Sequence, residues 1–236
     1  MYDKTNSRTG GAGSRADAGT KRTMTDKKQL SHEIVLLCEH IDIAQFISVY
    51  IDYLRKQQVE IPAVKIINIG DINKTEQILQ QLTRQTWFDE IKKIIIFADA
   101  TKKRLDREHQ LYKARLHTFL KDFTDYEYFL FPCKTAAGRW QSGFLEDVLL
   151  DTLKMETSEY CNYYNLRNMT EDFLLSVNND RGRENRFINH NRHFLCTYLA
   201  GTKKYAGLKL AEAAQKGAFD LSSNKFDDLK AVLKGL

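Results

Sequence analysis

The sequence predicts an α/β protein with a mainly parallel four-stranded sheet flanked by helices and with additional helices in its C-terminal part. Four short apolar runs alternate with segments whose apolar residues recur every three or four positions, as in βαβ units. The runs are apolar throughout, which is typical of parallel strands covered on both faces. After about residue 155 the chain is more polar and reads as helical.

The four strands are predicted from β-branched and aromatic runs that end at turn residues. Gly70 stops the second run and Pro132 stops the fourth, because proline cannot donate a hydrogen bond to a neighbouring strand. The expected strands cover residues 33–38, 63–70, 93–99 and 126–132.

The helices between the strands are predicted from apolar residues at helical spacing, with Asn73 or Thr75 as a plausible N-cap of the second. They cover residues 41–57, 73–85, 106–123 and 143–154. Four further helices, which we expect to pack on the sheet and not to form a second domain, cover residues 165–179, 189–202, 208–217 and 225–236.

Composition places the chain among cytoplasmic proteins. Its 236 residues suffice for a single domain over residues 31–236, preceded at 1–30 by a Gly/Ser/Thr/Lys-rich disordered segment or extension. No apolar run approaches the ~20 residues that cross a bilayer, and the first residues lack the apolar core of a secretory signal. The four cysteines form no CxxC pair, which favours reduced thiols over a disulfide framework or a zinc site.

The net charge of +5 is concentrated outside the expected domain. Residues 1–30 hold seven basic and three acidic residues, so the remainder of the chain is nearly neutral. A basic surface on the domain therefore requires local clustering. One such cluster, Lys102, Lys103 and Arg104, follows the third strand directly and is a candidate contact for a nucleic-acid backbone, although a solvated loop and first helical turn is the favoured explanation.

Acidic residues lie past each of the four predicted strands. Asp71 follows the second strand, and the acids after the other three are the candidates for a shared site. Glu39 comes after the first strand, Asp99 ends the third, and Glu146 and Asp147 begin the helix after the fourth. The carboxyl ends of parallel strands lie at one edge of a sheet, so these acids meet if their strands are near neighbours. Such a set suits Mg²⁺ or Mn²⁺ and phosphate chemistry.

Each acid also has a structural explanation. Glu39 or Asp42 can cap the first helix, and Glu146 and Asp147 are favourably placed in the first turn of another helix. The sequence leaves both explanations open.

Three segments, "LLCEHIDIAQFI", "IIIFADA" and "FLFPCKTAAGRWQSGFLEDVLL", resemble the Toprim domain of primases, topoisomerases and overcoming-lysogenization-defect nucleases. With the tail "KKYAGLKLAEAAQKGAFDLSSNKFDDLKAVL", the chain resembles more closely a Toprim-like bacterial family of unknown function, over roughly residues 32–236. The resemblance implies Glu39 and Asp99 as acid/base or metal-binding residues, with Glu146 and Asp147 as further ligands of Mg²⁺ or Mn²⁺.

The chain departs from the Toprim pattern at three places. His40 stands where the family has glycine, Ile43 where it has a second acid, and Thr101 where a DxD pair has its second aspartate. We therefore expect nuclease-like phosphodiester chemistry with a degraded acidic site. The alternative is a catalytically inactive binding module. Because related proteins work with ABC- or AAA-type ATPases and this chain has no Walker motif, such an ATPase would be a separate subunit.

Overall fold

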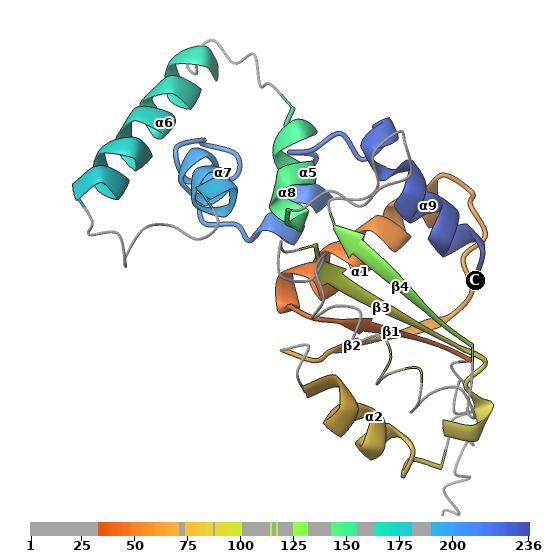
Figure 1. Cartoon of the computed structure of the whole chain (residues 1–236). Helices are drawn as coiled ribbons and strands as arrows, with labels where there is room; N and C mark the ends of the chain where they lie inside the picture. Colours follow the sequence, from red (N-terminus) through yellow and green to blue (C-terminus); the bar gives the residue numbers. More distant parts are fainter. Residues whose placement is uncertain are drawn as a thin grey trace, which may run out of the picture. The chain divides into compact units, whose positions relative to one another are not determined.

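Four parallel strands form one sheet in the computed structural model, in the order β2-β1-β3-β4 (Figure 1). The strands are β1 (Ile34–Cys38), β2 (Val64–Asn68), β3 (Lys93–Asp99) and β4 (Asp125–Phe131). This confirms the predicted α/β class and the four-stranded parallel sheet. The order places β1 and β3 side by side in the centre, with Cys38 opposite Phe97.

The structure describes residues 33–70, 74–86, 88–100, 114, 117, 125–131, 143–154, 163–180 and 190–236. Several predictions fall outside these residues. They concern the segment 1–30, the basic cluster Lys102, Lys103 and Arg104, Thr101, and the helix 106–123 apart from Ala114 and His117, which are helical.

Helices cover both faces of the sheet (Figure 1). Alternate residues of β1 point to opposite sides, with Leu36 in one apolar core and Leu37 in the other. The larger core joins the sheet to α1 and the C-terminal helices, while the smaller core lies against α2. The helices are α1 (Ile41–Lys56), α2 (Thr75–Leu82), α5 (Leu145–Asp151), α6 (Tyr163–Asp180), α7 (His190–Ala200), α8 (Leu210–Gln215) and α9 (Asp227–Lys234), with short 3-10 turns at Phe88–Glu90 and Asn224–Phe226.

The central strands have the burial that a continuous apolar sequence predicts. All five residues of β1 and six of the seven residues of β3 are buried. In the described part of the chain, no helix combines the length and apolar character needed to cross a bilayer.

Candidate functional site

Glu39 and Asp99 meet at the carboxyl edge of the two central strands. Glu39 follows β1 directly and Asp99 ends β3, so the parallel pairing of these strands places the two acids together. The backbone N–H of Asp99 donates to Oε2 of Glu39 at 3.2 Å. Both residues are buried, with 2% of Glu39 and 5% of Asp99 exposed. Two buried carboxylates on adjacent strands form the core of the site.

His40 lies over both carboxylates from the solvent side. Its Nε2 is 3.8 Å from Oε2 of Glu39 and 3.9 Å from Oδ2 of Asp99, and 48% of its side chain is exposed. Ligand atoms of these three residues all lie within 4.8 Å of one another, which is an arrangement that can hold a metal ion. We call these residues the strand-edge cluster.

His40 occupies the N-cap position of α1 without acting as a side-chain cap. Its backbone is extended (φ −123°, ψ 153°), as N-cap residues usually are, but its side chain makes no capping hydrogen bond. The imidazole is directed to the carboxylates instead. The position that starts α1 therefore supplies a third polar group to the cluster.

The environment of Asp99 disfavours its charged form. The pKa of the Asp99 carboxyl is raised from 3.8 to about 7, chiefly by burial and to a smaller extent by the negative charges of Glu146 and Asp147. The hydrogen bond from the N–H of Leu145 to Oδ1, at 2.9 Å, and the Arg192 guanidinium act in the opposite direction. A cation beside Asp99 would relieve the cost of this buried charge, and such perturbed carboxyl groups occur most often at functional sites.

Asp147 has the structural role that the sequence left open. Its Oδ2 accepts a hydrogen bond from the N–H of Phe144, the N-cap of α5, at 2.8 Å. Its Oδ1 accepts another from the side chain of Asn191 at 2.6 Å. Asp147 therefore holds the first turn of α5 and links it to α7.

Glu146 and Asp147 lie near the strand-edge cluster without belonging to it. Their charges act on Asp99, but among the described residues the group of mutually close ligand atoms comprises Glu39, His40 and Asp99. Glu146 is buried, and its Oε1 lies 3.3 Å from Nη1 of Arg192. A role for Glu146 and Asp147 as direct metal ligands remains a prediction.

Arg192 links the elements around the site. Its Nη2 lies 2.6 Å from Oδ2 of Asp42 in the first turn of α1, and its Nη1 contacts Glu146 in α5. No local pattern signals this pairing, because the three residues are far apart in the chain. For His40 a signal existed, namely an imidazole directly after a strand-end carboxylate.

We predict that Arg192→Met lowers the free energy of unfolding by about 1–3 kcal/mol, because it removes the guanidinium from the buried Glu146 carboxylate. This loss is smaller than for a fully buried ion pair, because Arg192 is half exposed. The double variant Arg192→Met, Glu146→Gln should recover part of this loss. Urea unfolding measures both. Lys225→Met, which breaks the exposed pair with Asp151, is the control and should cost about 0–1 kcal/mol. Equal losses for the two single variants would contradict the linking role of Arg192.

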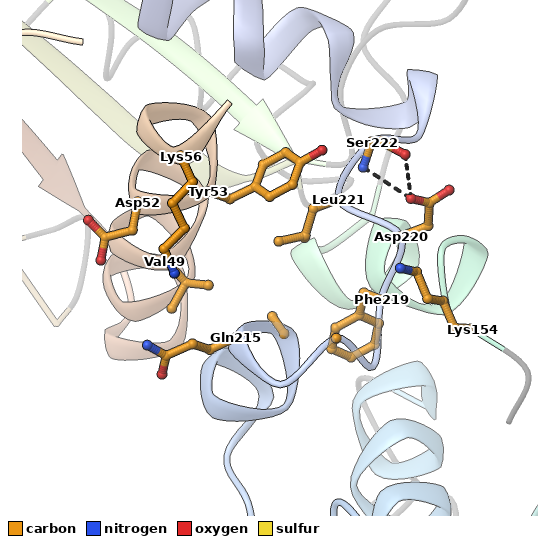
Figure 2. Close-up of a pocket in the computed structure, with 12 residues that line it drawn as sticks. Val49, Asp52, Tyr53, Lys56, Lys154, Gln215, Phe219, Asp220, Leu221 and Ser222 are labelled. Carbon is orange, nitrogen blue, oxygen red and sulfur yellow. Dashed lines mark hydrogen bonds between the residues drawn. The ribbon is translucent and has the colours of Figure 1, made fainter. Parts of the chain in front are cut away.

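A separate cavity of about 230 Å³ lies at the C-terminal half of α1 (Figure 2). Val49 and Tyr53 of α1 line it together with Phe219 and Leu221, and the Lys154 side chain reaches toward Asp220 at its rim. None of its lining residues belongs to the strand-edge cluster. The cavity and the strand-edge cluster are therefore two distinct sites.

Comparison with protein-family models, curated proteins and solved structures finds no significant match to this chain. The geometry of the site is therefore the basis for inferring function, and the resemblance to Toprim domains remains an expectation.

Proposed function

We propose that this chain binds a divalent cation at the strand-edge cluster and acts on phosphodiester bonds of nucleic acid. The observation that carries the proposal is the meeting of the Glu39 and Asp99 carboxylates at the carboxyl edge of adjacent central strands. This edge is where open parallel sheets place their ligands. Carboxylate oxygens are the ligands that Mg²⁺ and Mn²⁺ prefer, and the resemblance to Toprim nucleases supports the same chemistry.

Glu39 and Asp99 would hold the cation, and His40 lies within reach of it. A bound divalent cation polarises a phosphoryl oxygen and lowers the pKa of a water molecule. The chain's own contribution is to fix the carboxylates. The Asp99 N–H orients Glu39, and the Leu145 N–H orients Asp99. Both hydrogen bonds come from backbone groups, so the orientation does not depend on mobile side chains.

The second candidate function is a binding module that acts with a separate ATPase. One observation favours it: Arg192 already neutralises Asp42 and Glu146, so fewer acids face a cation than the sequence suggested. Affinity purification of the tagged chain from its native host distinguishes the two. If an ATPase is recovered with the wild-type chain and equally with variants of the strand-edge cluster, the binding module is favoured.

We expect Mn²⁺ to raise the melting temperature of the wild-type chain, because a ligand that binds only the folded state stabilises it by mass action. At a hundredfold excess over its dissociation constant, the gain is about 2.7 kcal/mol. For a chain of this size that corresponds to a shift of roughly 5–10 °C. Glu39→Gln and Asp99→Asn should abolish the shift. Asp151→Asn, which alters an acid distant in sequence from the cluster and paired with Lys225, should retain it.

The same variants test the phosphodiester chemistry. Wild-type protein with Mn²⁺ should nick plasmid or degrade single-stranded DNA, and Glu39→Gln should not. Nicking that persists in Glu39→Gln would rule out the strand-edge cluster as its source. A metal-dependent stabilisation without any cleavage would favour the binding module.

A further inference from the structure

We propose that His40 is a metal ligand and makes the strand-edge cluster selective for transition-metal ions over Mg²⁺. This inference rests on the proposed cation site and names the class of ion that it takes. Two observations carry it, the position of the His40 imidazole over two buried carboxylates and the absence of a helix-capping bond from that side chain.

The spacing of the three ligand atoms suits a small metal ion. Metal–ligand bonds of 2.0–2.2 Å place neighbouring ligand atoms about 3.0 Å apart in an octahedral site and about 3.4 Å apart in a tetrahedral one. The Nε2 atom of His40 is 3.8 and 3.9 Å from the two carboxylate oxygens. Small side-chain rotations close the difference. Because His40 is half exposed, its imidazole has room to make them.

The chemistry of the donor set decides the ion. Imidazole nitrogen suits Fe²⁺, Co²⁺, Ni²⁺ and Zn²⁺, whereas Mg²⁺ prefers oxygen ligands in a near-ideal octahedron and keeps much of its water. Two carboxylates alone give Mg²⁺ and Mn²⁺ similar hard ligands. One imidazole added to them favours the transition metals, with affinity that increases from Mn²⁺ through Fe²⁺ to Co²⁺.

Three protein ligands would leave the remaining coordination positions of the ion open. The two carboxylates are buried and the His40 side chain is half exposed, so solvent would reach such an ion from the side of His40. Open positions are typical of catalytic sites and not of structural ones. A phosphate oxygen or a water molecule can occupy them.

Isothermal titration with Mg²⁺, Mn²⁺ and Co²⁺ tests the inference on the full chain. Wild type should bind Co²⁺ and Mn²⁺ more tightly than Mg²⁺. His40→Ala should weaken Co²⁺ and Mn²⁺ binding by at least the roughly 10–100-fold that loss of an outer-shell partner costs, and leave Mg²⁺ binding nearly unchanged. His40→Asp, which supplies a carboxylate instead, should shift the preference toward Mg²⁺. His190→Ala is the control, since His190 pairs with Glu171 in α6.

A spectroscopic readout separates ligation from a merely structural role. Co²⁺ bound to wild type should show visible absorption bands that change in His40→Ala and persist in His190→Ala. Metal binding could depend on Glu39 while the ratio of the Co²⁺ and Mg²⁺ affinities is the same in wild type and His40→Ala. That result would overturn this inference and leave the proposed function standing. Failure of all three ions to bind would overturn both.

Discussion

Asp99→Asn should be more stable than the wild-type chain at pH 8 in the absence of divalent cations. The wild-type carboxyl is buried and its pKa is raised from 3.8 to about 7, so at pH 8 the folded protein carries an unfavourable buried charge. Asparagine removes that charge while keeping an oxygen that can accept the hydrogen bond from the Leu145 N–H. We expect a gain of a few kcal/mol, based on about 1.4 kcal/mol for each tenfold change in the acidity constant.

The gain should depend on pH in a defined direction. Below about pH 4, Asp99 is protonated in the folded and unfolded wild type, so the two proteins should have similar stability. Between about pH 4 and 7 the unfolded chain has released the proton that the folded chain retains, and the wild type loses stability as the pH rises. Above pH 7 both states are ionised, and the advantage of Asp99→Asn should remain constant.

Thermal melts of both proteins in EDTA between pH 4 and 9 measure this difference. Asp52→Asn, which changes an exposed acid of α1, provides the control and should follow the wild type. Addition of Mn²⁺ should reduce the difference in melting temperature between Asp99→Asn and wild type, because the ion stabilises only the wild type. A difference between Asp99→Asn and wild type that stays constant with pH would show that the Asp99 carboxyl ionises normally. A residue whose replacement stabilises the protein but abolishes ligand binding is the expected mark of a functional site.

The sequence predicted the strands well because their signal is local. The third strand was expected at 93–99 and lies there, and the first was expected at 33–38 and lies at Ile34–Cys38. Continuous apolar runs bounded by charged or turn residues determine these limits. Helix ends were less accurate. The helix expected at 143–154 is Leu145–Asp151, because Phe144 is extended and the Asp147 side chain bonds to its N–H.

The strand order was not predictable from the same signals. Which strands pair depends on hydrogen bonds between residues that are distant in the chain, and the sequence supported only a conditional statement that the acids meet if their strands are neighbours. The order β2-β1-β3-β4 satisfies that condition for Glu39 and Asp99. Glu146 lies in the first turn of α5, after β4, which is one strand further from β1, and it forms an ion pair with Arg192.

The Toprim pattern, unlike the local sequence, directed attention away from His40. Compared with that pattern, which has glycine here, His40 is a departure, whereas in the structure its imidazole lies among the ligand atoms of the strand-edge cluster. The difference is physical. A sequence pattern records which residue type replaces another, but ligation depends on where the imidazole points once α1 begins, and that follows from the packing of α1 on the sheet.

That packing depends on the C-terminal end of the chain. Phe226, 176 residues beyond Tyr50, is fully buried against α1, with ring centroids 5.2 Å from Tyr50 and 5.6 Å from Phe46. The short turn Asn224–Phe226 and α9 therefore complete the core on which α1 rests, and the tail of the sequence supports the helix that carries His40.

Phe226→Ala should lower the free energy of unfolding by about 3–5 kcal/mol, the usual cost of emptying a buried phenylalanine site. Phe226→Leu keeps more of the volume and should cost less. Phe173→Ala, at a position in α6 that is 57% exposed, should change stability by no more than about 0.5 kcal/mol. Urea unfolding of the three variants gives the comparison. If Phe226→Ala were no worse than Phe173→Ala, the C-terminal segment would not belong to the core. The position of α1 at the strand-edge cluster would then have to depend on the sheet alone.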